Sequence, residues 1–172
     1  MKKEYIRLIA IILIILFILI SFIIYNQLPL LIGKKIILAT NPVDPFDPFR
    51  GQYMNINYEI STLENTQKFE INEKVYVILK EDEEGIFRMQ DLSRNRPDEG
   101  FFIRGEVKRV YGNTMSIEYG IEQYFFEKSA KLPTINITIV AKVDNFGHAV
   151  LKEMLYNGKP LEIEYKEFKI TS

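Results

Sequence analysis

The feature that most constrains this chain is a run of apolar side chains near its N-terminus. Thirteen consecutive apolar residues extend from Leu8 to Ile20, and Phe22 to Tyr25 continue the run after Ser21. With Ile6 included, the run approaches the roughly 20 residues that an α-helix needs to cross the hydrocarbon core of a bilayer. A core helix of so small a domain needs a polar face toward water, and this run has none. We therefore predict a transmembrane helix over residues 6–26 and name the lipid bilayer as its partner.

The charges beside this run predict its orientation. Lys2, Lys3 and Arg7 lie at its N-terminal side, and the positive-inside rule then favours an N-terminus in the cytoplasm. Lys34 and Lys35 follow soon after the exit of the helix and weaken that preference. The sequence therefore predicts a single-pass protein of the cell membrane with its C-terminal part on the extracytoplasmic side.

A cleaved secretory signal peptide is the alternative to a retained anchor. Such a peptide needs small residues in an A-x-A-like pattern directly after the apolar core. The residues from Ser21 to Pro29 are mostly bulky where small ones are required. We therefore expect a retained anchor, with residues 1–5 in the cytoplasm, residues 27–34 as a tether and residues 35–172 as an extracytoplasmic β domain.

The composition excludes several classes of protein. The 172 residues include 22 Lys and Arg against 23 Asp and Glu, so the chain lacks the basic excess typical of nucleic-acid binders. The absence of cysteine excludes a disulfide framework, thiolate zinc ligands and a cysteine nucleophile. A single histidine, His148, excludes histidine-rich metal cages, and its place at a hairpin end predicts a surface residue. We expect no metal, no cofactor and no nucleic-acid partner.

Beyond residue 34 the apolar residues recur with a period of two, which is typical of strands with one buried face. Glycine-containing turns such as Asn157-Gly158 separate many of these runs and indicate hairpins. Nine short runs of this kind predict a mainly β fold, either an antiparallel β-sandwich or a partly open β-barrel. The runs are Lys35–Ala39, Tyr53–Ile60, Val75–Lys80, Ile86–Gln90, Phe101–Val110, Met115–Tyr119, Thr134–Val143, Ala149–Tyr156 and Leu161–Lys166.

Two segments interrupt the strand pattern. Residues Ile121–Lys128 predict a short helical insertion of one or two turns. The polar segment Ser61–Asn72 predicts a loop with a short helical piece.

The least ordinary segment runs from Asn41 to Tyr53 and contains three Asx-Pro steps. Each proline fixes its own φ and pushes the preceding residue to extended geometry, so the segment predicts a rigid loop. Asp44 and Asp47 either form turns, with Arg50 as their ion-pair partner, or the three residues form a ligand or cation site at the rim of the sheet. The structural interpretation is preferred because no EF-hand-like run supplies the further oxygen ligands.

Two blocks of residues suggest a family. The octapeptide Gly51-Gln52-Tyr53-Met54-Asn55-Ile56-Asn57-Tyr58 resembles the signature of the bacterial GDYXXLXY family, and the Asp-Pro-x-Asp-Pro-x-Arg run before it resembles the usual lead-in. The block Tyr119–Glu127 is similar to a second recurring stretch of that family, and the likeness spans roughly residues 35–168. This chain departs from the signature with Gln52 in place of Asp and Ile56 in place of Leu.

The resemblance implies a membrane-anchored protein, since family members are described as encoded beside or fused to multi-pass membrane proteins of unknown function. It implies a multi-pass membrane protein as partner, and it brings no established reaction. The Gln52 departure removes a carboxylate, so the resemblance gives no catalytic or metal role to that position.

The sequence thus supports a binding role for the two blocks. Tyrosine suits an interface because one end of its ring is apolar and the other polar. We expect the blocks to lie together at one end of the β domain and to contact a membrane partner; the alternative is that the same rings are ordinary core. The candidate binding residues are Arg50, Gly51, Tyr53, Tyr58, Gly120, Glu122 and Tyr124, with Tyr119 in the same block.

A hydrolase is the alternative function. Glu122 and Glu127 flank an aromatic cluster, and a carboxylate beside buried rings can act as a general acid. Paired with Asp44 or Asp47, these residues would form a two-carboxylate site in a membrane-tethered enzyme. No feature of the sequence shows that these groups meet. The preferred function is therefore an accessory or binding protein at the membrane surface.

Overall fold

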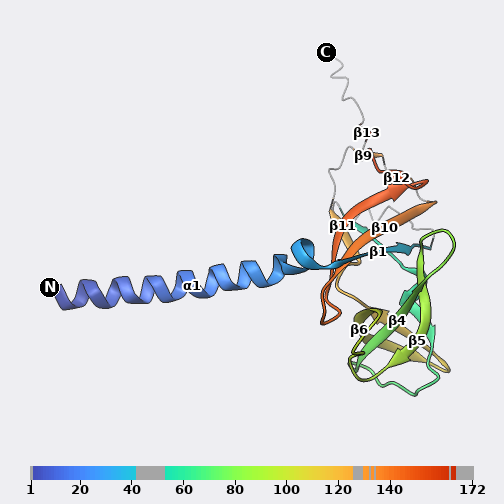
Figure 1. The fold of residues 1–172 in the computed structure, drawn as a ribbon, viewed down its shortest axis with the longest axis horizontal. Helices are drawn as coiled ribbons and strands as arrows, with labels where there is room; N and C mark the ends of the chain where they lie inside the picture. The colour runs from blue at the N-terminus through green and yellow to red at the C-terminus, as the bar shows by residue number, and fades with distance from the viewer. Residues whose placement is uncertain are drawn as a thin grey trace, which may run out of the picture.

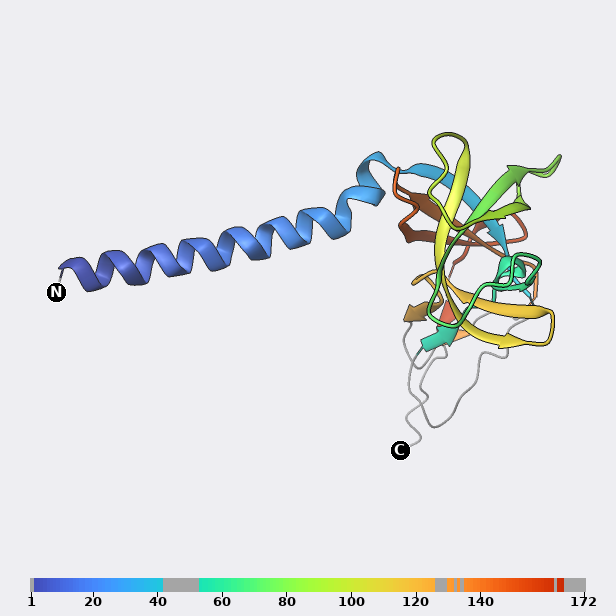
Figure 2. The same cartoon turned by 90° about the horizontal axis from the view of Figure 1, so that it is seen from below.

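The computed structural model describes residues 2–41, 53–125, 130–131, 133, 135–162 and 164–165. It combines one long N-terminal helix with a domain of antiparallel strands, and the helix projects from one side of that domain (Figures 1 and 2). One of the sheets is curled like half a barrel. The predicted mainly β fold with an N-terminal apolar helix is therefore confirmed.

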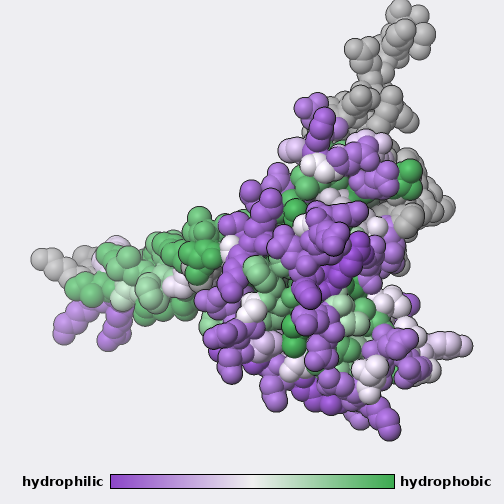
Figure 3. All heavy atoms as spheres, turned by 45° about the vertical axis from the view of Figure 1, so that its right-hand side comes forward, coloured by the Kyte–Doolittle hydropathy of each residue, from purple (hydrophilic) through white to green (hydrophobic). Residues whose placement is uncertain are grey.

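Helix α1 (Lys2–Ile32) contains the whole segment predicted to cross a membrane. Within the span from Lys3 to Ile32, the most apolar stretch of 18 residues has a mean hydropathy of 3.4, and none of it is buried by the rest of the protein. Figure 3 shows that the surface of α1 is mostly hydrophobic, whereas the surface of the β domain is mostly hydrophilic. In the described part of the chain, α1 is the only helix that is long enough and apolar enough to cross a bilayer. The helix continues through most of the residues predicted as a tether, so Gly33 alone separates it from the first strand.

The β domain contains two larger sheets. The first has the order β1-β10-β11-β12, and the second has the order β3-β7-β6-β4-β5. In the first sheet these strands are β1 (Lys34–Ala39), β10 (Ile137–Val143), β11 (Ala149–Tyr156) and β12 (Lys159–Pro160). In the second they are β3 (Thr62–Glu64), β4 (Lys74–Glu81), β5 (Phe87–Ser93), β6 (Phe101–Tyr111) and β7 (Thr114–Glu118).

Two short ladders complete the domain. Strand β2 (Tyr53–Asn55) pairs with β8 (Gln123–Phe125), and β9 (Ala130–Lys131) pairs with β13 (Glu164–Tyr165). A single 3₁₀ turn, η1 (Glu59–Ser61), lies between β2 and β3. Every strand pair among the described residues is antiparallel.

The alternating sequence pattern explains how the strands build one core. In β4, Val75, Val77 and Leu79 are buried, while the residues between them are less so. Strand β10 buries Ile137 and Ile139 in the same way, and a bulge after Val140 shifts its register with β11. These side chains belong to a single hydrophobic cluster to which both larger sheets contribute. The two larger sheets therefore share one core.

The predicted helical insertion over Ile121–Lys128 is wrong where the structure describes it, because Gln123–Phe125 form β8. A three-residue strand is too short for its period to be distinguished from a helical turn. The helical turn that does occur, η1, falls inside the run predicted as a strand over Tyr53–Ile60. The predicted hairpin at Asn157-Gly158 is present, and both residues have positive φ, 49° and 76°.

Gly105 in β6 allows β7 to pack closely. A Cβ at this position would lie 2.3 Å from Cγ2 of Ile117 and 3.0 Å from the ring of Tyr119. We expect Gly105→Ala to lower the free energy of unfolding by about 1–3 kcal/mol, the usual cost of overpacking. Urea unfolding of the detergent-solubilised full chain, followed by near-ultraviolet circular dichroism, measures it. Arg109→Ala, on the exposed face of the same strand, is the control, and an equal effect of both substitutions would contradict the packing argument.

Candidate functional site

The two sequence blocks that resemble a family signature meet in the structure. Strand β2 from the first block pairs with β8 from the second, with Met54 opposite Tyr124 at the centre of the ladder. The contact continues past the strands, because the Ile56 N–H donates a hydrogen bond of 2.6 Å to the carbonyl oxygen of Glu122. We call residues 53–58 together with residues 119–125 the motif junction.

The end of β1 also reaches the motif junction. Thr40 forms an isolated antiparallel bridge with Tyr58, and the Asn41 N–H donates a hydrogen bond of 2.8 Å to the Asn57 carbonyl oxygen. Three segments that are distant in sequence are therefore joined here by backbone hydrogen bonds. This pairing satisfies backbone groups that would otherwise be left without partners in the protein interior.

Two buried tyrosines hold the motif junction from inside. The Tyr58 hydroxyl donates to the Ile121 carbonyl oxygen at 2.6 Å, and the Tyr119 hydroxyl donates to the Ile60 carbonyl oxygen at 2.5 Å. Their rings meet edge to face with centroids 6.4 Å apart. Each tyrosine therefore fixes the backbone of the segment that carries the other. Both side chains are buried, so they belong to the core and do not line an exposed surface.

Burial also determines the protonation of these two side chains. Removal from water raises the pKa of Tyr58 and of Tyr119 well above the ordinary phenol value, and the nearby negative charge of Glu122 raises both further. Both phenols therefore remain neutral hydrogen-bond donors at physiological pH.

Glu122 closes the turn that leads into β8. One of its carboxylate oxygens accepts the Tyr119 N–H at 2.5 Å, and the other accepts the Gly120 N–H at 2.9 Å. Gly120 has a φ of +83°, a conformation that glycine adopts without steric cost. Because backbone donors occupy both oxygens, Glu122 acts as a turn-forming carboxylate in this arrangement.

Of the remaining predicted site residues, the structure describes some and leaves others outside the described ranges. Tyr124 is half-buried against the core, and its neighbour Phe125 is exposed. For Tyr53 the structure describes the backbone, which pairs with that of Phe125 in the ladder of β2 and β8. The other predicted residues, Asp44, Asp47, Arg50, Gly51 and Glu127, lie outside the described residues. The two-carboxylate site and the cation site therefore stay predictions. Within the described ranges, no three acidic or histidine side chains are grouped to hold a metal ion.

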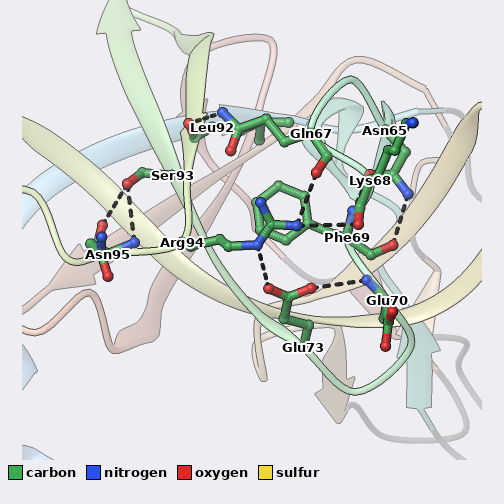
Figure 4. Close-up of polar contacts among 10 residues, drawn as sticks. All are labelled: Asn65, Gln67, Lys68, Phe69, Glu70, Glu73, Leu92, Ser93, Arg94 and Asn95. Atoms are coloured by element: carbon green, nitrogen blue, oxygen red, sulfur yellow. Dashed lines mark hydrogen bonds and ion pairs between the residues drawn. The ribbon is translucent and has the colours of Figure 1, made fainter.

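Sequence reasoning missed a polar cluster around Arg94 (Figure 4). The Arg94 side chain donates to Glu73 at 2.7 Å and to two backbone carbonyl oxygens, those of Gln67 and Lys68, and it stacks on the ring of Phe69. The Glu70 N–H and Arg94 together lower the pKa of the Glu73 carboxyl. The cluster ties the loop between β3 and β4 to the end of β5, and its half-exposed ion pair has a structural role.

Sequence reasoning also missed the contact between α1 and the β domain. His148 lies in the loop between β10 and β11, where its ring contacts the ring of Tyr25 edge to face at 5.9 Å. Asp144 and Arg104 contact the two ring nitrogens of His148. A groove of about 130 Å³ lies between these elements, lined by Tyr25, Asn26, Pro29, His148, Ala149 and Val150. His148 is thus a partly buried contact residue, and the pattern of a single strand gives no signal for such a contact.

Comparison with known proteins gives one match. A family model described as "GDYXXLXY protein" matches residues 15–154, which include both halves of the motif junction and most of α1. Neither a curated protein nor a solved structure matches the chain.

The buried tyrosines predict a specific dependence of stability on pH. Their pKa is raised in the folded protein, so the unfolded chain loses these protons first as the pH rises above about 10. The free energy of unfolding then falls, by up to about 1.4 kcal/mol per pH unit for each tyrosine. Urea unfolding of the full chain at a series of pH values from 8 to about 11 measures this slope.

Substitution of the tyrosines tests the assignment. In the double variant Tyr58→Phe, Tyr119→Phe the slope above pH 10 becomes flatter, although stability at pH 8 also falls because two carbonyl oxygens lose their donors. Tyr111→Phe is the matched control, since that ring is 90% exposed. A double variant with the slope of the unsubstituted chain would show that these phenols are not the groups responsible.

Proposed function

We propose that this chain, which belongs to the GDYXXLXY family, is a membrane-anchored accessory protein whose β domain lies outside the cytoplasm and binds a multi-pass membrane protein. Family membership carries no reaction with it. The argument therefore depends on the exposed apolar helix and on the motif junction.

The surface of α1 supports anchoring in the membrane. Its apolar residues lie on every side of the helix, and the β domain leaves most of them exposed. Water solvates such a surface poorly, whereas lipid chains solvate it well, and the helix satisfies its backbone groups internally. Lys2, Lys3 and Arg7 at its start favour an N-terminus in the cytoplasm, which would put the β domain on the other side.

The pairing of β2 with β8 is the observation that carries the binding proposal. It joins the two family blocks, which are separated in sequence by residues 59–118, into one ladder. Tyr58 and Tyr119 fix that ladder from the core, so its outer residues are pre-organised. A surface that is already ordered loses less conformational entropy when a partner binds. Among the side chains of this ladder whose exposure the structure describes, the aromatic ring of Phe125 is exposed and that of Tyr124 is partly exposed.

The hydrolase alternative has weaker support. It needs at least one carboxylate free to exchange a proton with a substrate. Glu122, the candidate among the described residues, has both oxygens engaged by backbone N–H groups. We therefore propose that Glu122 positions the ladder.

The orientation is tested by labelling single cysteines, because the chain has none of its own. We expect Tyr111→Cys, at the exposed end of β6, to react with a membrane-impermeant maleimide in protoplasts. Lys3→Cys is the matched control and is expected to react after the cells are permeabilised. Labelling of Lys3→Cys and protection of Tyr111→Cys in protoplasts would overturn the proposed orientation.

The binding face is tested by photo-cross-linking in the membrane. A photoreactive amino acid is placed at Tyr124 in the full chain and, as a control, at the distant exposed position Tyr111. We expect the Tyr124 position to cross-link a multi-pass membrane protein, identified by mass spectrometry, and the Tyr111 position to cross-link it much less. The added substitution Phe125→Glu should reduce the product, because it puts a charge on an apolar contact. Equal products from both positions, or products that Phe125→Glu leaves unchanged, would count against this face.

A further inference from the structure

We propose that the edge of the β domain nearest α1 binds the headgroup layer of the bilayer, with Phe146 as the side chain that inserts. This juxtamembrane edge consists of Leu31, Ile32, Lys34, Arg96 and Phe146. The proposal builds on the proposed membrane anchoring and adds a second, peripheral contact with the lipid.

No flexible spacer separates the helix from the β domain. The apolar span from Lys3 to Ile32 has 30 residues, or about 45 Å at the helical rise, which equals the thickness of a bilayer with its headgroups. Strand β1 begins two residues later, at Lys34. The Gly33 N–H between them donates to the Pro29 carbonyl oxygen at 2.8 Å, and a Cβ on Gly33 would lie 2.3 Å from that oxygen. A helix placed across the bilayer therefore holds the domain at the level of the headgroups.

The loop between β10 and β11 lies on the membrane-facing side of the domain. In Figures 1 and 2 this loop is at the edge of the domain nearest the helix. Its His148 touches Tyr25, a residue one to two turns before the end of α1. The loop thus reaches back along the helix toward the bilayer.

Internal hydrogen bonds fix the conformation of this loop. One carboxylate oxygen of Asp144 accepts the N–H groups of Phe146 and His148, at 2.8 and 2.9 Å. The Gly147 carbonyl oxygen accepts the Arg104 N–H of β6 at 2.8 Å, which ties the loop to the second sheet. Phe146 is therefore held at the tip of a rigid loop while 53% of its surface stays exposed.

The chemistry of the juxtamembrane edge suits the boundary between lipid and water. Leu31 and Ile32 are 75% and 66% exposed, so apolar surface continues from the helix to the domain. The Arg96 guanidinium lies 5.5 Å from the centre of the Phe146 ring, and the Lys34 ammonium lies 5.3 Å from that of Phe101. Aromatic rings and long cationic side chains together are typical of this boundary, where the ring enters the apolar layer and the cation stays hydrated.

Acidic residues near the juxtamembrane edge indicate which property of the lipid determines binding. Asp98 and Glu99 line the same hollow of about 460 Å³ as Lys34, Arg96 and Phe146, so the edge carries charges of both signs. Binding then depends mainly on burial of apolar area, and we expect it on zwitterionic phosphatidylcholine as well as on anionic lipid.

Tryptophan fluorescence tests the proposal cleanly, because the chain contains no tryptophan. The full chain with Phe146→Trp is reconstituted in phosphatidylcholine vesicles whose acyl chains are brominated near the headgroup, or in matched vesicles without bromine. We expect a loss of emission in the brominated vesicles. Asn145→Trp, on the exposed tip of the same loop, is a second reporter. Tyr111→Trp is the distant control and should emit equally in both kinds of vesicle.

A reporter within α1 separates this proposal from the anchoring itself. Phe17→Trp lies in the middle of the apolar helix, and in vesicles brominated deep in the acyl chains it should lose emission if α1 is inserted in the bilayer. If it does so while both loop reporters emit equally in the two kinds of vesicle, the headgroup contact is overturned and the anchor stands. If Phe17→Trp also emits equally, the anchoring and the contact that builds on it both fail.

Discussion

The structure depends on one constraint, the unfavourable contact between water and the apolar surface of α1. Soluble domains hide such surface in a core, but the β domain has a hydrophobic core of its own and leaves most of α1 exposed. At about 25 cal/mol per Å² of apolar area, a helix of this length cannot stay in water without a large cost in free energy. A bilayer would remove that cost, and in the anchoring that we propose α1, Gly33 and β1 set where the β domain lies relative to the lipid.

Within the β domain, a few polar contacts determine the shape of the surface that we propose for binding. The ladder of β2 and β8 has three residues on each side, which is short for a stable pair. Tyr58, Tyr119 and Glu122 compensate, because each connects one block of the motif junction to backbone groups nearby. In the binding that we propose, these buried side chains would act on a partner only through the order that they impose on Tyr124 and Phe125. The second block thus combines a core aromatic residue with aromatic residues of the proposed binding surface.

Local patterns in the sequence predicted much of the fold. The unbroken apolar run predicted α1, the period of two predicted strands such as β4 and β10, and Asn157-Gly158 predicted a turn with positive φ. Contacts between distant segments were not predictable in the same way. A tyrosine fits a core or an interface equally well, so Tyr58 and Tyr119 stayed ambiguous until their burial was known. The contact of His148 with Tyr25 depends on how a helix and a hairpin meet, and neither segment alone carries a signal for it.

The central claim is that α1 remains attached to the β domain and resides in the membrane. The most direct measurement is the intact mass of the mature protein recovered from cell membranes after alkaline carbonate extraction. The account predicts a membrane-pellet species whose mass includes every residue of α1. A soluble species that lacks the opening residues would contradict it, because the β domain would then act without an anchor.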